Sequence, residues 1–171
     1  MKKNIYANND VLYPALCAWK KQLNETGNRK MPDILGSAIM NIANGLIHRW
    51  NFNGYSEDWK LDMVDDGIEA AIAGLHNYDE TQYTNVYGYI NKTCWMAFVG
   101  RIMREKKETA KKYRFFLENV YDSGDEDLNK IADENFIQDM HDKLNQYEKS
   151  ANKVKETKIA DESPTLEMFY D

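Results

Sequence analysis

The chain has few cysteines and no long apolar run, and each shortage excludes a class of protein. Its two cysteines, Cys17 and Cys94, each lie among apolar residues, which indicates buried thiols in a reducing compartment and not a disulfide framework. No stretch of about 18 apolar residues is present, and no signal peptide is recognisable. We therefore expect a cytosolic protein with no membrane partner.

Sequence features of enzymes are also missing. The chain has no glycine-rich phosphate loop, and His48, His76 and His141 are scattered, with no serine or cysteine placed beside them as a nucleophile. No Glu-x-x-His pair offers a mixed set of metal ligands. We expect a non-catalytic protein that has no metal and no cofactor.

Strand-type alternation is absent as well, whereas apolar residues recur at helical spacing almost throughout. The pattern predicts an all-α fold: a compact multi-helix domain, a further helical segment and a flexible carboxyl-terminal tail. A first helix is expected over residues 11–23, capped by Asn9 or Asp10. A second is expected over residues 34–50, with Pro32 just ahead of it.

The third expected helix begins after Ser56, a natural N-cap, and has two contrasting faces. Its predicted core-facing stripe is Leu61, Val64, Ile68, Ala71 and Leu75. Its predicted opposite face carries four carboxylates: Asp62, Asp65, Asp66 and Glu69. Such a row suits metal binding or acid–base chemistry, but no second helix repeats it. We favour docking against a positively charged partner.

Aromatic residues then spread round most of the helix expected over residues 83–102. They include Tyr83, Tyr87, Tyr89 and Trp95. A central helix wrapped by its neighbours explains this pattern as well as a binding surface does. Flat rings and cations on successive turns would also allow one helix to hold a strand that has left the duplex.

The overall charge of −6 conceals two segments of opposite sign. Residues 92–114 carry eight basic residues against Glu105 and Glu108, a local net charge of +6, whereas residues 118–142 hold nine carboxylates against Lys130. Ordinary solvated helix faces are one explanation. A basic surface for phosphates beside an acidic surface is the other.

The end of the chain is the least typical segment. A last helix is expected over residues 136–147, and residues 148–163 lack an apolar stripe, as flexible tethers do. The chain then ends on four large apolar side chains, Leu166, Met168, Phe169 and Tyr170, which either fold back or bind another molecule. The expected organisation is a main domain (1–121), an acidic helical segment (122–147) and a tether with a terminal motif (148–171).

Several motifs carry a resemblance to a known family. The string DMVDDG at 62–67, then LHNYD at 75–79, then an aromatic helix ending in GRI at 100–102, resembles conserved region 2 of bacterial sigma factors. More narrowly, the chain is similar to the late-transcription sigma factors of T-even-type bacteriophages. That similarity covers nearly the whole chain and rests on the strings GLIHRWNFNGYSEDWK, GLHNYDETQY, ENVYDS, DENFIQD and DESPTLEMFYD.

The resemblance implies a role for each surface. In sigma factors, the helix that matches residues 62–67 docks on the coiled coil of the largest polymerase subunit, which implies docking by Asp62, Asp65 and Asp66. Glu69 joins them by helix geometry alone. The following helix resembles the segment that melts the promoter −10 element and captures flipped bases. The DNA-binding residues expected on this basis are Tyr83, Tyr87, Tyr89, Lys92, Trp95, Arg101, Arg104, Lys106 and Lys107.

One departure from the family pattern concerns the melting aromatics. Tyr89 aligns with a family aromatic, but the family's tandem tryptophans fall at about Lys92 and Thr93. Tyr83, Tyr87 and Trp95 are the candidates to replace them.

The resemblance also implies the partners and the setting. They are host RNA polymerase core, late promoter DNA, a late co-activator on the same polymerase, and the phage sliding clamp, bound by Leu166, Met168, Phe169 and Tyr170. The expected location is the cytoplasm of the infected bacterium. The alternative is a helical polymerase-binding adaptor, or an anti-sigma-like protein, which makes no DNA contact and has no need of the basic segment.

Overall fold

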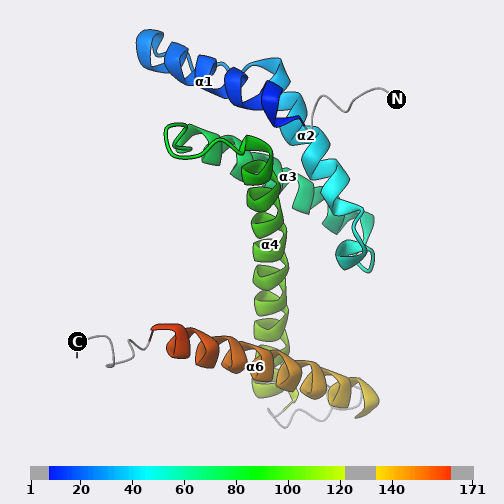
Figure 1. Cartoon of the computed structure of the whole chain (residues 1–171). Helices are drawn as coiled ribbons and strands as arrows, with labels where there is room; N and C mark the ends of the chain where they lie inside the picture. The colour runs from blue at the N-terminus through cyan, green and yellow to red at the C-terminus, as the bar shows by residue number, and fades with distance from the viewer. Residues whose placement is uncertain (1–7, 122–133, 163–171) are drawn as a thin grey trace, which may run out of the picture. The chain divides into compact units, whose positions relative to one another are not determined.

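The structure is a computed structural model that describes residues 8–121 and 134–162, and these residues form helices and no strand. The all-α prediction is confirmed (Figure 1). The elements are α1 (Asn9–Thr26), α2 (Asp33–Ile47), the short 3-10 helix η2 (Trp50–Phe52), α3 (Glu57–His76), α4 (Val86–Phe116), the π-helical η3 (Leu117–Tyr121) and α6 (Glu134–Glu162).

The chain divides into two compact units, Met1–Ile102 and Met103–Asp171. The first contains α1, α2, η2, α3 and the amino-terminal half of α4, and the second contains the rest of α4 with η3 and α6. The domain boundary that the sequence suggested, after residue 121, therefore falls within the second unit.

The predicted cap of α1 was wrong by one residue. Asn8 is the N-cap, and its side chain accepts a hydrogen bond from the amide of Asp10. Asn9 instead links α1 to the start of α4. Its Oδ1 accepts from the amide of Val86 at 2.8 Å, and its Nδ2 donates to the carbonyl of Thr84 at 2.6 Å. A side chain from α1 thus satisfies an amide in the first turn of α4, where amides lack partners within the helix.

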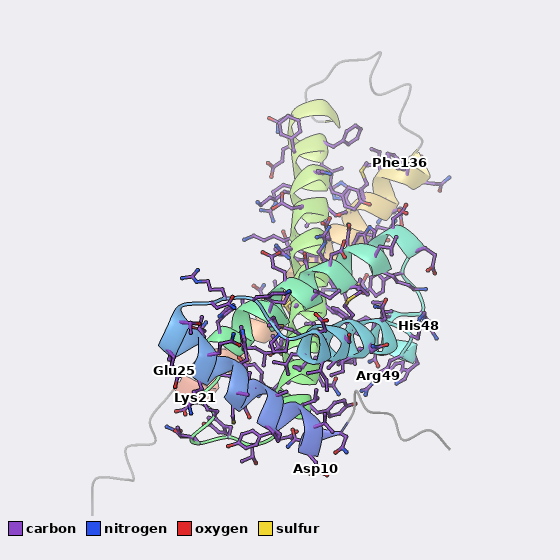
Figure 2. All side chains as sticks on the ribbon, turned by 90° about the horizontal axis from the view of Figure 1, so that it is seen from above. Asp10, Lys21, Glu25, His48, Arg49 and Phe136 are labelled. Atoms are coloured by element: carbon purple, nitrogen blue, oxygen red, sulfur yellow. The ribbon has the colours of Figure 1, made fainter. Side chains whose placement is uncertain are left out.

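One side of α1 is buried and the other is open. Leu12, Leu16 and Trp19, at i, i+4 and i+7, are almost completely buried. Lys21 and Glu25 lie on the outer side of the helix, where they form an ion pair at 3.9 Å (Figure 2). This amphipathic pattern explains why α1 packs as the sequence predicted.

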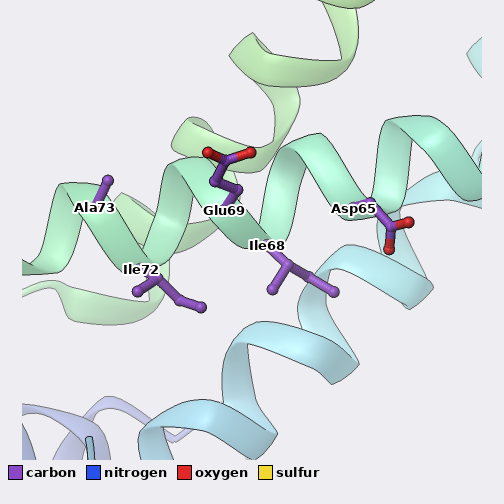
Figure 3. Close-up of a pocket in the computed structure, with 5 residues that line it drawn as sticks. All are labelled: Asp65, Ile68, Glu69, Ile72 and Ala73. Carbon is purple, nitrogen blue, oxygen red and sulfur yellow. The ribbon is translucent and has the colours of Figure 1, made fainter. Parts of the chain in front are cut away.

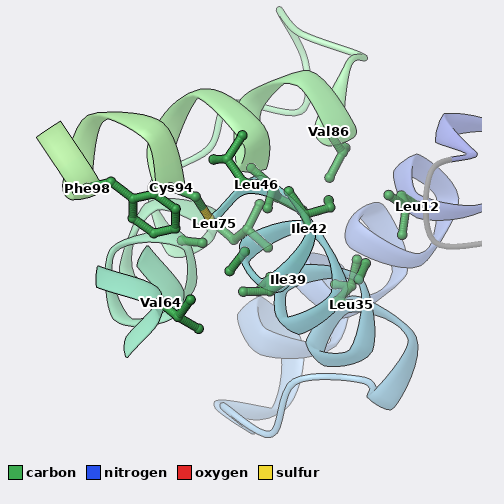
Figure 4. Packing of buried hydrophobic residues seen from close by; sticks show 14 of the residues in the cluster. Leu12, Leu35, Ile39, Ile42, Leu46, Val64, Leu75, Val86, Cys94 and Phe98 are labelled. Carbon is green, nitrogen blue, oxygen red and sulfur yellow. The ribbon is translucent and has the colours of Figure 1, made fainter. Parts of the chain in front are cut away.

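The core of the first unit is apolar and draws on all four of its long helices (Figure 4). Ser56 caps α3 as predicted, because its hydroxyl accepts from the amide of Trp59. The predicted stripe on α3 needs one correction: Leu61 is 64% exposed. The buried face of α3 is Met63, Val64, Gly67, Ala71 and Leu75. The buried face is turned away from Leu61, because Gly67 packs against α4 and Met63 lies in the core.

Close packing of α3 against α4 depends on the absence of a side chain at Gly67. A Cβ atom there would lie 2.6 Å from Cε1 of Phe98, a ring that is fully buried. The Cys94 thiol also reaches the Gly67 carbonyl, with the sulfur 3.4 Å from the oxygen. The two helices approach this closely because Gly67 contributes no side chain to the contact, which leaves room for Phe98 and Cys94.

We expect Gly67→Ala to lower the free energy of unfolding by about 1–3 kcal/mol, because the Phe98 ring must move within a packed core. Gly45→Ala is the matched control, since a Cβ there meets nothing within 4 Å. In a helix interior that change is expected to stabilise by about 0.5–1 kcal/mol. Urea unfolding of both variants checks the pair, and equal effects would contradict the close packing.

The second unit has its own small apolar cluster. Leu117, Ile137 and Met140 are buried, and Tyr113, Phe116 and Leu144 pack against them. The predicted last helix over residues 136–147 is present within α6. The helix continues to Glu162, however, so residues 148–162, expected as part of a flexible tether, are helical in the structure. Glu, Lys and Ala are frequent in this stretch, and they favour helix without an apolar stripe.

Candidate docking and nucleic-acid-binding surfaces

The four carboxylates predicted as one docking row on α3 are divided by the structure into two pairs. Asp62 and Asp66 face α4, where both bind Arg101. Nη2 of Arg101 lies 2.6 Å from Oδ2 of Asp62, and Nη1 lies 3.3 Å from Oδ1 of Asp66. A residue predicted to bind DNA therefore holds two residues predicted to bind polymerase.

Asp65 and Glu69 form the second pair, and neither has an ion-pair partner among the residues that the structure describes. They border an open hollow of about 380 Å³ with Ile68, Ile72 and Ala73 (Figure 3). Figure 3 shows Asp65 and Glu69 pointing in different directions, with Ile68 and Ile72 on the lower side of the helix in this view. The arrangement suits a partner that presents both apolar and cationic side chains.

The apolar part of this surface was missed by the sequence reasoning. Leu61 is 64% exposed and Ile72 is 41% exposed, although both are large aliphatic residues. At 100° per residue, Leu61, Ile68 and Ile72 fall within about 40° of one another. That spacing was a usable signal for a second apolar face. We call Leu61, Asp65, Ile68, Glu69 and Ile72 the α3 surface.

Most of the predicted DNA-stacking aromatics are engaged inside the first unit. The Tyr89 hydroxyl donates to the Gly74 carbonyl at 3.1 Å, and its ring packs edge-on against Tyr78. The Trp95 ring lies edge-on to Phe52, with centroids 5.1 Å apart. Tyr87 is also half-buried against the core.

Tyr83 differs from these aromatics because it lies before α4 and is 60% exposed. Its ring still contacts Tyr78, with centroids 6.4 Å apart. Of the four predicted aromatics, Tyr83 has the most ring surface open to a base.

The loop that carries Tyr83 is fixed by side chains of α1. Lys20 donates to the carbonyls of His76 and Tyr78, and its ammonium lies 3.3 Å from the Glu80 carboxylate. The Tyr13 hydroxyl donates to the Glu80 carbonyl at 2.9 Å. The sequence predicted no role for Lys20 or Tyr13. Every residue has a backbone carbonyl, so residue types do not show which carbonyls of a distant loop will accept hydrogen bonds.

The predicted cations differ in their surroundings. Lys92 is exposed in the first unit, whereas Arg101 is held by the two aspartates. In the second unit, Arg104, Lys106 and Lys107 are exposed on α4. The predicted cations are therefore divided between the two units, and Arg101 among them is held by carboxylates.

Two buried ionisable groups of the first unit have raised pKa values. Burial raises the pKa of the Cys94 thiol to about 11, so this group is protonated at neutral pH. Burial also raises the pKa of Tyr78. No three His, Cys, Asp or Glu side chains are grouped to hold a metal ion in the part of the chain that is described. No helix within that part is both long and apolar enough to cross a membrane.

Four residues near the carboxyl terminus are predicted to bind the sliding clamp. Leu166, Met168, Phe169 and Tyr170 lie outside the described residues, as does the segment over 122–133.

Comparison with known proteins gives no family for the chain. No protein-family model matches it, and a search of curated proteins finds no significant match. The surfaces described above and the resemblance of the motifs are therefore the basis on which a function is assigned.

Proposed function

We propose that the chain is a phage late-transcription sigma factor, which binds host RNA polymerase core and directs it to promoters with a −10-like element. The observation that carries the proposal is the α3 surface, where exposed aliphatic side chains adjoin two carboxylates without ion-pair partners among the described residues. Its chemistry matches the docking role that the motif at residues 62–67 implies. The largest-subunit coiled coil of the polymerase is the proposed partner.

DNA contact is proposed for the loop and helix that follow. Tyr83 supplies an exposed ring, and Lys92 supplies an exposed cation in the same unit. Arg104, Lys106 and Lys107 supply cations in the second unit. Rings bind unpaired bases and cations bind phosphates, so this set fits the opening of a promoter.

A second candidate function is an adaptor that binds polymerase without contacting DNA. It is favoured by the internal contacts of Tyr89, Trp95 and Arg101, which occupy three of the residues predicted for DNA. Run-off transcription from a late-type promoter distinguishes the candidates, because core polymerase with an adaptor alone has nothing to recognise the promoter.

The proposal extends to two accessory partners. The terminal motif at Leu166, Met168, Phe169 and Tyr170 is proposed to bind the sliding clamp, while a late co-activator occupies the same polymerase. Burial of large apolar side chains contributes roughly 1.5–3 kcal/mol each, and ordering about seven residues costs roughly 1–2 kcal/mol apiece. The near balance favours weak, reversible attachment to a moving ring.

Removing residues 165–171 is expected to leave unassisted transcription unchanged and to remove most stimulation by the clamp. Basal and clamp-dependent transcript yields, measured side by side on one template, check this prediction. The matched control is the change of Glu162 to alanine just before the deleted segment, which should keep the stimulation. Loss of basal activity or of folding would show instead that the tail belongs to the protein's own core.

A further inference from the structure

A second hollow lies within the second unit, between α4 and α6, and three of its five lining residues are cationic. It measures about 160 Å³ and is lined by Lys107, Ala110, Lys111, Arg114 and Tyr147. We call it the α4–α6 hollow. Its volume corresponds to about five water molecules at bulk density, a size that suits one small polyatomic anion.

Helical spacing brings the three cations to one side. Lys107, Lys111 and Arg114 stand at i, i+4 and i+7 on α4, so they share a face of that helix. Ala110 lies among them and is 6% exposed, and its small side chain leaves the space that a larger residue would fill. Tyr147 reaches the hollow from α6.

Two of these cations are held in place by carboxylates. Lys111 lies 2.8 Å from Glu108, and Arg114 lies 2.5 Å from Glu148 on α6. Lys107 has no ion-pair partner among the residues that the structure describes. Two carboxylates against three cations leave the hollow with a net positive charge, supplied by Lys107.

The polar groups at the hollow are chiefly hydrogen-bond donors. An ammonium and a guanidinium only donate, and a phenol hydroxyl donates readily. A ligand for such a set must be anionic and rich in acceptors, and a phosphate group meets both needs. We propose that the α4–α6 hollow binds a phosphate group, supplied by the backbone of a nucleic acid.

This proposal specifies the site at which Lys107 would contact DNA. It rests on the proposed function only in naming a nucleic acid as the source of the phosphate group. It adds α6, through Tyr147, to a surface that the sequence reasoning confined to α4. It requires no polymerase, so it is tested with the full chain alone. A failure of docking through α3 therefore leaves this test unaffected.

The first arm of the test compares two neighbouring lysines in binding to a labelled single-stranded oligonucleotide and to a duplex of equal length. Lys107→Gln removes the hollow's unpaired cation, whereas Lys106→Gln removes the same charge from the next position, outside the hollow. We expect Lys107→Gln to weaken binding by about threefold to tenfold more than Lys106→Gln does. Lys107→Arg should restore most of the loss.

A second variant separates hydrogen bonding from charge. Tyr147→Phe keeps the ring and the net charge and removes only the hydroxyl donor, so we expect about a threefold loss of affinity. Helical circular dichroism of every variant verifies folding. The proposal is overturned if Lys106→Gln and Lys107→Gln weaken binding equally while Tyr147→Phe changes nothing, since that result describes a diffuse basic surface.

The second arm identifies the source of the phosphate. Inorganic phosphate is titrated into the chain while backbone amide shifts are followed by NMR. Oligonucleotide binding through the hollow, with no saturable shift from inorganic phosphate, supports a backbone phosphodiester. Saturable shifts from inorganic phosphate at the lining residues, lost in Lys107→Gln and without oligonucleotide binding, overturn the nucleic-acid assignment in favour of a free phosphate ligand.

Discussion

Replacing Asp65 and Glu69 with lysine is expected to weaken binding to core polymerase by about 100-fold or more. Each change places a positive charge where a cationic partner surface is expected, and like charges brought together at an interface cost several kcal/mol. Neither carboxylate has an internal ion-pair partner among the described residues, so the fold should tolerate the changes. Competition binding to core polymerase measures the loss.

The matched control for a single charge reversal at Asp65 is Glu25→Lys. Glu25 lies on the outer side of α1, where its side chain is 61% exposed and pairs with Lys21 of the same helix (Figure 2). It changes the net charge by the same amount at a place with no proposed partner. Equal losses from Asp65→Lys and Glu25→Lys would mean that net charge alone governs binding, which contradicts docking through the α3 surface.

Replacing Arg101 with glutamine is expected to have opposite effects on the two proposed partners. The guanidinium holds Asp62 and Asp66 in the free chain, so its loss makes both carboxylates more accessible to a cationic partner. We expect about threefold to tenfold tighter binding to core polymerase, mainly through faster association. If Arg101 also contacts a promoter phosphate, as the sequence predicts, promoter binding weakens at the same time and the salt slope becomes smaller by about one.

The same ion pair also bears on stability. The side chains of Arg101, Asp62 and Asp66 are 25%, 53% and 23% exposed, so solvent screens these ion pairs in part and their loss should cost about 1 kcal/mol. Arg101→Lys is the control, because it keeps the charge and loses the forked geometry. A parallel fall of polymerase and DNA binding in Arg101→Gln, matched by lower stability, would indicate a purely structural residue.

Local sequence pattern predicted most of the long helices of the fold. Helical periodicity predicted the helices, and Ser56 as an N-cap is confirmed because a cap depends on its own helix's amides. Leu61 was wrongly assigned to the buried face of α3. Helical spacing shows which residues share a face, but it does not show which face a neighbouring helix covers. Helix over residues 148–162 was missed because its stabilisation comes from residue propensity, which apolar periodicity does not record.

Contacts between distant residues account for the rest of the candidate site. Arg101 is 39 positions from Asp62 and 35 from Asp66, and only the packing of α4 on α3 brings them together. Tyr89 depends on a carbonyl at Gly74 in the same way. A sequence pattern assigns each helix face separately. It therefore predicted DNA binding for Arg101 and polymerase binding for Asp62 and Asp66, whereas the structure pairs these side chains with one another.

Run-off transcription separates a sigma factor from a polymerase-binding adaptor. Core polymerase and the full chain are combined on duplex templates with and without a −10-like late promoter, in the presence and absence of the clamp. We expect a transcript that requires both the chain and the promoter, increases with the clamp, and disappears when Asp65 and Glu69 are lysine. A chain that binds core polymerase but yields no promoter-dependent transcript under any of these conditions would contradict the proposed function.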